Sequence, residues 1–209
     1  MPVYITENNL VKSFITKVRN KESNSVVFGE NLKKITLALA LEANKEFALV
    51  DQTIETPLRE CVAKKIDSSV IVVPVMRSGL IMSEALKTLF EDCAVIHLGI
   101  YRDENLQANR YYAKEPANLT SSTNKKVILC DPLIATGNTL KEALGILKDY
   151  NFEDIFVLGV IMSERAKNEL TSEFPNLNIY VAEVDKELND HGYIVPGVGD
   201  AGDRLFGTK

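Results

Sequence analysis

The chain has 209 residues, 45% hydrophobic and 25% charged, which is enough for one domain with a sizeable core. Its net charge of −5 argues against general binding to nucleic acids or membrane surfaces, although a local basic pocket for phosphate remains compatible with it. Three cysteines without metal-ligand spacing indicate incidental, reduced thiols, and two distant histidines argue against a histidine-rich metal site. We expect no leader peptide, no membrane-spanning segment and a cytoplasmic location.

The first sixty residues are expected to form two helices and an extended arm. Apolar side chains recur at helical spacing over residues 7–19 and again from Phe28 to Leu39, with a polar break at residues 19–25 between them. Residues 50–57 alternate weakly and end in Thr-Pro. This pattern favours an extended excursion or a hairpin.

From Ser69 onward, buried strands alternate with helices. Apolar, β-branched runs predict strands at residues 70–75, 93–100, 126–130, 155–162 and 178–184, with helices ending at Phe90, Tyr150 and Phe174 between them. This alternation predicts an α/β fold with a doubly wound, mostly parallel sheet. Ligands of such folds bind at the carboxyl ends of the strands.

One stretch of small residues follows the strand at residues 126–130. The strand ends in Asp131, and a short turn then leads into a segment with helical periodicity. The first amide groups of a helix and the positive end of its dipole attract anions such as phosphate, while Asp131 would accept hydrogen bonds from hydroxyls or metal-bound water. The alternative is an ordinary strand–turn–helix connection capped by Thr136 or Asn138.

Charged residues follow three of the predicted strands. Arg77 follows the first strand, Arg102 the second and Asp131 the third, so a parallel sheet brings them to one edge. Two arginines, a helix start and an acid suit a ligand with several phosphates and hydroxyls. Taken singly, each arginine is better explained by a surface ion pair.

Residues 102–123 are polar and lack a helical period, which is typical of a functional lid or of disorder.

The end of the chain is dense in glycine. From Gly192 onward we expect neither a strand nor a helix of any length. Ile194, Val195, Leu205 and Phe206 favour a tight wrap over a frayed tail. In such a wrap the backbone itself approaches a ligand.

Five stretches of the chain match one known family. They are DPLIATGNT at residues 131–139, VPVMRSGLIM at 73–82, HLGIYRDENLQ with YYAKEP within 97–116, GYIVPGVGDAGDRLFGT at 192–208 and ALEANKEFALVDQTIETPL at 40–58. The chain resembles the uracil phosphoribosyltransferases, within the type I phosphoribosyltransferase superfamily, over nearly its whole length. The tail motif is the most specific of the five, because the wider superfamily shares no such tail.

The chain departs from the family pattern at several positions. Asn138 and Thr139 replace the usual Gly and Ser but keep amide and hydroxyl donors. Ser-Gly-Leu-Ile at residues 78–81 replaces Ala-Gly-Leu-Gly, and Glu115 replaces a leucine before proline. Gly29 stands where the family carries arginine. We expect that last change to affect packing, subunit contact or regulation rather than chemistry.

The resemblance implies a pentosyltransferase that transfers the phosphoribosyl group of 5-phosphoribosyl-1-diphosphate (PRPP) to N1 of uracil. The products are UMP and diphosphate, as in pyrimidine salvage. The cofactor would be Mg²⁺, bound through PRPP rather than by direct protein ligands. The single domain at residues 1–209 would carry a uracil-binding hood at 192–209. We expect a homodimer or a larger homo-oligomer that does not bind nucleic acid or membranes. GTP activation, which occurs in some relatives, stays open.

The resemblance also assigns roles to individual residues. Arg102, Asp131 and Asp200 would be catalytic, and the segment at residues 102–112 would close over the site as a hairpin-like lid. Tyr193 and Pro196 would form apolar walls around uracil. For Asp203 and Arg204, an ordinary structural role, an ion pair that holds the tail, is favoured over a catalytic one. The expected PRPP-binding residues are Arg77, Arg102, Asp131, Pro132, Leu133, Ile134, Ala135, Thr136, Gly137, Asn138, Thr139 and Asp200, and the expected uracil-binding residues are Tyr193, Ile194, Gly199, Asp200 and Ala201.

Two other classes of function compete with an enzyme. A regulatory nucleotide- or RNA-binding protein on the same fold would need a basic face, and the sequence pI of about 5.2 counts against one. A catalytically silent paralogue would have lost Asp131, Arg102 or the tail, and all three are present.

Overall fold

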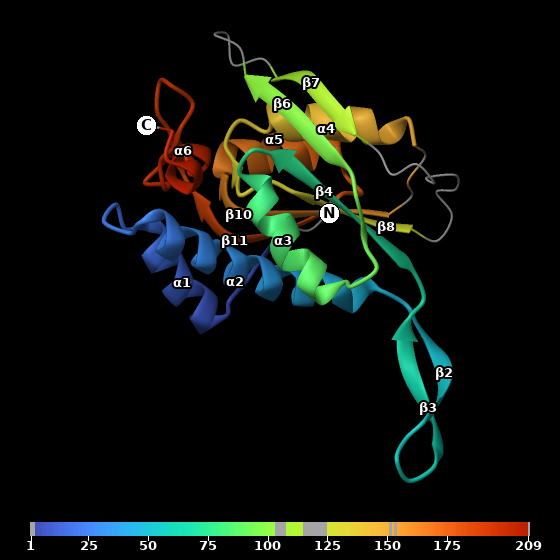
Figure 1. Ribbon diagram of the computed structural model, residues 1–209. Coiled ribbons are helices and arrows are strands. Elements are labelled where there is room, and N and C mark those ends of the chain that lie inside the picture. The colour runs from blue at the N-terminus through green and yellow to red at the C-terminus, as the bar shows by residue number, and fades with distance from the viewer. Residues whose placement is uncertain (1–2, 103–107, 115–124, 151, 153, 209) are drawn as a thin grey trace.

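A computed structural model describes residues 3–102, 108–114, 125–150, 152 and 154–208 of the chain. Its strands form one large sheet with helices on both faces, and a separate hairpin projects away from this body (Figure 1). The helices are α1 (Asn9–Arg19), α2 (Ser25–Ala43), the short 3₁₀ helix η1 (Asn44–Glu46), α3 (Gly79–Leu89), α4 (Asn138–Lys148), α5 (Glu164–Glu173) and α6 (Ala201–Phe206). None of the described helices is long and apolar enough to cross a membrane.

The large sheet has nine strands in the described part of the chain, in the order β1-β11-β10-β8-β4-β6-β7, with β5 on β4 and β9 on β10. These strands are β1 (Val3–Ile5), β4 (Ser69–Met76), β5 (Ala94–Val95), β6 (His97–Arg102), β7 (Ala108–Lys114), β8 (Lys125–Cys130), β9 (Leu133–Ile134), β10 (Asp154–Ser163) and β11 (Asn178–Asp185). The pairs from β1 through β6 are parallel, whereas β7 runs antiparallel to β6. The doubly wound, mostly parallel fold is confirmed.

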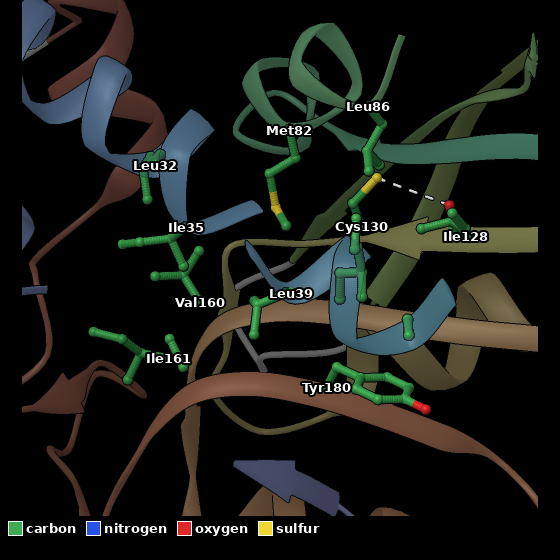
Figure 2. Packing of buried hydrophobic residues seen from close by; sticks show 14 of the residues in the cluster. Leu32, Ile35, Leu39, Met82, Leu86, Ile128, Cys130, Val160, Ile161 and Tyr180 are labelled. Atoms are coloured by element: carbon green, nitrogen blue, oxygen red, sulfur yellow. Dashed lines mark hydrogen bonds between the residues drawn. The ribbon is translucent and has the colours of Figure 1, made fainter. Parts of the chain in front are cut away.

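Alternate side chains of the central strands enter two different cores. In β8, Ile128 and Cys130 pack with α1, α2 and α3, whereas Val127 and Leu129 pack with α4 and α5. Figure 2 shows the first core, where α2 and α3 side chains lie over β8, β10 and β11. Because successive residues of a strand point to opposite faces, a continuous apolar run is what a sheet covered on both sides requires.

The predicted polar break caps the second helix. Oδ1 of Asn24 accepts a hydrogen bond from the amide of Val27 at 2.9 Å, and α2 begins at the next residue, Ser25. Oδ1 of Asn8 likewise accepts from the amide of Leu10 at 2.9 Å, so α1 begins at Asn9 rather than at residue 7. Side-chain oxygens at these positions satisfy amides that have no partner within the helix.

The extended arm is a hairpin. Strands β2 (Leu49–Glu55) and β3 (Glu60–Ile66) pair antiparallel and project from the body (Figure 1). The lid segment also contains a hairpin, since β7 returns along β6. Residues 103–107 and 115–124 of that segment lie outside the described part of the chain. The predicted strand at residues 93–100 is divided into β5 and β6, which pair with different parts of β4.

The tail wraps against the body instead of fraying, as predicted. Ile194, Val198 and Ala201 are buried in the core shared with α2 and α3. The expectation that the tail holds no regular structure is wrong, because it contains the two-residue strand β13 (Ile194–Val195), paired with β12 (Glu187–Leu188), and the six-residue helix α6. Asp200 makes this helix possible, since its Oδ1 accepts from the amide of Asp203 at 2.9 Å.

Gly29, the departure in α2, lies where three helices meet. A Cβ at this position would lie 3.4 Å from Cδ2 of Leu205 in α6 and 3.7 Å from Cδ1 of Ile81 in α3. These are ordinary contact distances for one added carbon, but a longer side chain would have to displace α6 or α3 side chains. The geometry supports a packing role for this position.

Gly79 lets α3 begin directly against the central sheet. A Cβ here would lie 2.6 Å from the carbonyl oxygen of Cys130, a backbone atom that cannot move aside cheaply. We predict that Gly79→Ala lowers the free energy of unfolding by about 1–3 kcal/mol, as overpacking does. Urea denaturation followed by circular dichroism measures this change.

Gly145 provides the matched control. It is exposed in the middle of α4, and a Cβ there would meet nothing within 4 Å. Gly145→Ala should therefore raise stability by about 0.5–1 kcal/mol through helix propensity alone. Equal effects of the two substitutions would contradict the close approach at Gly79.

Candidate active site

A cavity of about 460 Å³ lies at the carboxyl edge of the sheet, between the loop after β4, the loop after β8 and the tail. Figure 1 shows α6 on the side to which the arrowheads of β4 and β6 point. The structure thus brings together residues that the sequence predicted from three separate stretches. The predicted residues that line the cavity are Arg77, Asp131, Leu133, Ala135, Thr139, Tyr193, Ile194, Gly199, Asp200 and Ala201.

The remaining predicted residues are not among those that line the cavity. Pro132, Ile134, Thr136, Gly137 and Asn138 belong to the same turn but are not part of its wall. Pro196, expected as an apolar wall, is not part of it either. β6 ends at Arg102, whose side chain lies outside the described part of the structure.

Asp131 is the first residue after β8. Its amide donates to the carbonyl of Leu158 in β10 at 3.2 Å, so the backbone is still held by the sheet at this point. The side chain is only 7% exposed and lines the cavity. A buried carboxylate requires hydrogen-bond donors, and the amide of Leu133 provides one at 3.5 Å from Oδ1. A ligand with hydroxyl groups would supply others.

The turn after Asp131 presents backbone amides at the start of α4. Gly137 has φ of 82°, a left-handed conformation that favours glycine, and α4 begins at the next residue, Asn138. Oγ1 of Thr136 accepts from the amide of Asn138 at 3.4 Å. The alternative of a helix capped by Thr136 or Asn138 is wrong, because the N-cap residue is Gly137 and no side chain caps this end of α4. The glycine turn at this helix start is compatible with an anion site.

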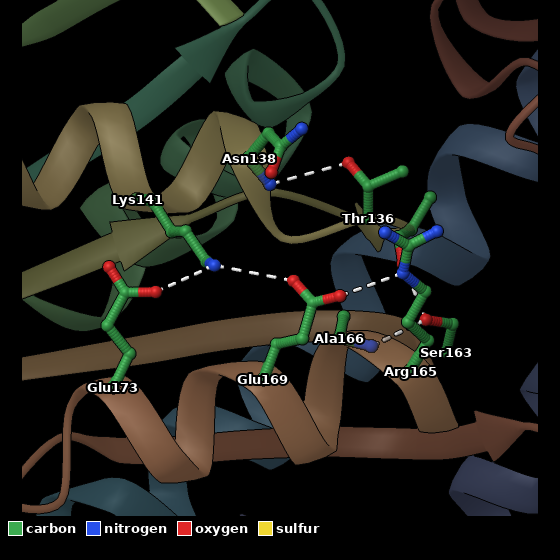
Figure 3. A network of polar contacts seen from close by, with 9 residues as sticks. Thr136, Asn138, Lys141, Ser163, Arg165, Ala166, Glu169 and Glu173 are labelled. Atoms are coloured by element: carbon green, nitrogen blue, oxygen red, sulfur yellow. Dashed lines mark hydrogen bonds and ion pairs between the residues drawn. The ribbon is translucent and has the colours of Figure 1, made fainter. Parts of the chain in front are cut away.

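Ser163 holds this turn from below (Figure 3). Its side chain is fully buried at the end of β10, where the hydroxyl donates to the carbonyl of Ala135 and accepts from the amide of Ala166 at 2.9 Å. One side chain thus links the turn to the first turn of α5. From the sequence, this residue was predicted only as the first residue of the helix that ends at Phe174.

An ion-pair network joins α4 to α5 next to the same turn (Figure 3). Nζ of Lys141 lies 3.3 Å from Glu169 and 2.7 Å from Glu173, and Nε of Arg165 lies 2.8 Å from Glu169. The two lysine contacts raise the pKa of Lys141, mainly through Glu173. The network is largely solvent-exposed, so we assign to it a role in helix alignment rather than a large share of stability.

Arg77 contacts the tail. Its Nη2 donates to Oδ1 of Asp203 at 3.0 Å, and its Nη1 donates to Oγ1 of Thr208 at 3.0 Å. The loop after β4 and the tail therefore close one end of the cavity together. The expected ion pair between Asp203 and Arg204 is wrong, because Asp203 pairs with Arg77 and Arg204 binds backbone carbonyls instead.

The tail places its backbone against the cavity. Gly197 has φ of 53°, and a Cβ there would lie 2.0 Å from the carbonyl oxygen of Ile194, so no other residue fits this turn. Ile194 before the turn and Gly199 after it both line the cavity. The tight turn therefore brings two stretches of main chain to one wall.

Several cavity residues were not predicted. Ser78 follows Arg77, Tyr101 precedes Arg102, and Gly202 lies in the first turn of α6. His191, one of the two histidines that were considered as possible metal ligands, also lines the cavity. Each is close in sequence to a predicted residue, and that proximity is the feature of the sequence that could have identified it as a site residue.

The cysteines do not contribute a nucleophile to the cavity wall. Cys130 is buried, and burial raises the pKa of its thiol. Partial burial likewise raises the pKa of Cys93. Among the described residues, no group of three or more His, Cys, Asp or Glu side chains is arranged to hold a metal ion.

Comparisons with known proteins agree with this geometry. The family model for uracil phosphoribosyltransferase matches residues 5–208. A uracil phosphoribosyltransferase from Malacoplasma penetrans is 39% identical over 207 residues, which is 99% of both chains. A solved protein structure from Aquifex aeolicus has a TM-score of 0.92 at 28% identity and covers 100% of this chain and 99% of its own. A hypoxanthine-guanine phosphoribosyltransferase structure from Bacillus anthracis, 16% identical with a TM-score of 0.53, shares the fold over 77% of this chain and 80% of its own.

The buried hydroxyl of Ser163 provides a test of the support beneath the turn. Ser163→Ala removes the cap of α5 and leaves the carbonyl of Ala135 without this donor. We predict a loss of about 1–3 kcal/mol in the free energy of unfolding. Thermal and urea denaturation measure it. The control is Ser172→Ala at an exposed position of α5, which should change stability by less than about 0.5 kcal/mol.

Proposed function

The chain belongs to the uracil phosphoribosyltransferase family, and on that premise we propose that the cavity at the carboxyl edge of the sheet is its active site. The chain is a pentosyltransferase of pyrimidine salvage that transfers the phosphoribosyl group of PRPP to N1 of uracil. One observation supports the location best: the buried Asp131, the helix-start turn and the glycine-rich tail share one cavity.

We assign the sugar-phosphate end of PRPP to the turn at residues 135–139. Backbone amides at the start of α4 would bind the 5′-phosphate, together with the hydroxyls of Thr136 and Thr139. As whole residues, these two threonines are 4% and 8% exposed. Asp131 would accept hydrogen bonds from the ribose hydroxyls. Because Ser163 and the sheet already hold the turn, little reorganisation is needed when the phosphate binds.

The arginines would bind the diphosphate. A guanidinium has five N–H donors, so the contacts of Arg77 to Asp203 and Thr208 leave donors for diphosphate oxygens. Arg102 is the last residue of β6, at the same edge, and would bind the diphosphate from the other side. Positive charge at this place stabilises the negative charge that develops as the bond from C1 of the ribose to diphosphate breaks. The segment at residues 102–112, predicted to act as a lid, would exclude water, a competing nucleophile, when it closes over the site.

The donor set of the cavity fits a magnesium ion that is bound mainly by substrate. Only the carboxylates of Asp131 and Asp200 line the described wall, and Mg²⁺ keeps several water ligands and prefers phosphate oxygens. Asp200 would contact PRPP or the water shell of the ion. When bound, the ion would neutralise part of the diphosphate charge.

The tail would recognise the base. Ile194, Gly199, Asp200 and Ala201 line the cavity. Their main-chain groups would face the base, and Tyr193 would form an apolar wall. Main-chain groups that donate to O4 and accept from N3–H of uracil leave buried groups unpaired with cytosine, which has the opposite pattern at this edge. Uracil N1 would attack C1 of the ribose with inversion, as diphosphate leaves and the N1 proton is lost. The homo-oligomeric state and the cytoplasmic location remain predictions.

The reaction itself can be assayed directly. Purified protein with uracil, PRPP and Mg²⁺ should form UMP and diphosphate in equal amounts, measured by chromatography and a coupled diphosphate assay. Cytosine under the same conditions should give far less product. Absence of UMP with folded protein would contradict the proposed function.

Asp131→Asn tests the ribose-binding role. The substitution keeps shape but replaces one acceptor oxygen with a donor, so hydrogen bonds to ribose hydroxyls are lost. We predict at least about a tenfold fall in turnover, or roughly 1.4 kcal/mol of transition-state stabilisation. The control Asp92→Asn, at an exposed position after α3, should retain turnover. A folded Asp131→Asn enzyme with less than that loss would refute the assignment.

A further inference from the structure

We propose that Arg19 and Asp185 are positioning residues for base recognition, which hold the tail in the conformation that admits uracil and rejects cytosine. Neither residue lines the cavity. Both act on the main chain of Gly197, which lies between the two stretches of backbone assigned to the base. This inference rests on the proposed function of the tail.

The two residues come from opposite ends of the chain. Arg19 is the last residue of α1, and Asp185 is the last residue of β11, where it lies in register with Ser163 of β10. Nη1 of Arg19 lies 2.8 Å from Oδ2 of Asp185, and Nη2 lies 2.7 Å from Oδ1. This bidentate geometry fixes both side chains in one orientation. The sheet thereby provides a fixed reference for the tail.

Arg19 and Asp185 together bind both backbone groups of Gly197. The amide of Gly197 donates to Oδ2 of Asp185 at 3.0 Å, and its carbonyl accepts from Nη1 of Arg19 at 3.1 Å. Asp185 is only 6% exposed, and these three donors satisfy its buried carboxylate. A group so placed resists displacement, because any movement of Gly197 would leave buried polar atoms unpaired.

Gly197 transmits this position to the cavity wall. Its left-handed turn brings it against the carbonyl of Ile194, and Val198 and Gly199 follow directly. Ile194, Val198 and Gly199 all line the cavity. The pair therefore sets the spacing between the two stretches of main chain that would face the edge of the base.

Arg204 ties the tail to α1 a second time. Its Nη1 donates to the carbonyls of Val18 at 2.6 Å and Val198 at 3.0 Å, and its Nη2 donates to that of Asn20 at 2.7 Å. Its guanidinium also lies over the ring of Phe28, 4.1 Å from the centroid. The carboxyl end of α1 is thus bound to the tail twice, once through Arg19 at Gly197 and once through Arg204. The amino-terminal helices gain a role in specificity that no cavity contact indicates.

The expected effect is larger on the base than on PRPP. Asp200, the tail residue assigned to PRPP, is held at the start of α6 by its hydrogen bond from the amide of Asp203, whereas Arg19 and Asp185 bind Gly197. A substitution far from the reacting centre that misplaces a substrate by about 1 Å can lower the rate on the order of a hundredfold. The turn that would bind the 5′-phosphate depends on β8, β10 and Ser163. The hydrogen bonds of Arg19 and Asp185 to Gly197 involve none of these, so loosening the tail should leave the turn intact. The KM values for the two substrates therefore separate a positioning role from general damage.

The experiment compares three variants with wild type and one control. Asp185→Asn replaces an oxygen that faces Arg19 or Gly197 with an amide donor, Arg19→Lys keeps the charge but loses the fork, and the third variant combines Arg19→Gln with Asp185→Asn. Glu187→Gln, at an exposed position two residues from Asp185, is the control. Steady-state assays give kcat, KM for uracil, KM for PRPP and the ratio of kcat/KM for uracil to that for cytosine.

We predict that Asp185→Asn and Arg19→Lys raise KM for uracil at least about tenfold and lower the uracil-to-cytosine ratio, while KM for PRPP changes less than about twofold. The double variant should be little worse than Asp185→Asn alone, because the two side chains act as one unit. The control should match wild type.

Two results would overturn the proposal: an unchanged KM for uracil in the folded variants, or a parallel rise in both KM values. If Asp185→Asn does not fold, Arg19→Lys decides by the same criteria. A wild-type protein that forms no UMP would instead refute the proposed function, so the two failures are distinguishable.

Discussion

Parallel pairing of β8 with β4 on one side and β10 on the other determines where the functional groups of this chain lie. Residues 69–74 of β4 run alongside residues 125–130 of β8, and residues 154–158 of β10 run alongside 126–130. The loops that follow β4 and β8 therefore leave the sheet at the same edge. Asp131 is still tied to β10 through its amide when its side chain enters the cavity. The site is rigid at this edge because its residues are attached to a sheet that is packed on both faces.

The two proposed halves of the site are held by different means. The turn after Asp131 is supported from below by a single buried hydroxyl, that of Ser163, and by the start of α4. The tail contains only the short elements β13 and α6, so its position depends in addition on hydrogen bonds that join it to the body. Arg19 and Asp185 reach Gly197 from the body, and Arg77 adds a contact from the loop after β4. Arg204 of the tail donates in the other direction, to the carbonyls of Val18 and Asn20. Recognition of sugar phosphate and recognition of base are thereby separable in physical terms.

The sequence predicted the parts of the molecule whose signal is local. Apolar runs identified β4, β8, β10 and β11, and the small-residue turn after Asp131 identified the helix start. The three-residue β1 is too short to show a period, and α6 escaped notice because its cap, Asp200, lies among glycines. The partners of Arg77 and Arg19 were beyond sequence reasoning. Arg19 and Asp185 are 166 positions apart, and no periodic pattern reports a contact between residues so distant.

In the proposed active site, one cavity holds the phosphate of the nucleotide at the start of α4 and its base against the tail. A crystal structure of the protein with bound UMP tests it most directly. We expect the 5′-phosphate on the backbone amides of residues 136–139 and the ribose hydroxyls at Asp131. The edge of uracil should face the main chain of Ile194 and Ala201, which line the cavity. A base bound away from the tail, or a phosphate bound away from this turn, would contradict it.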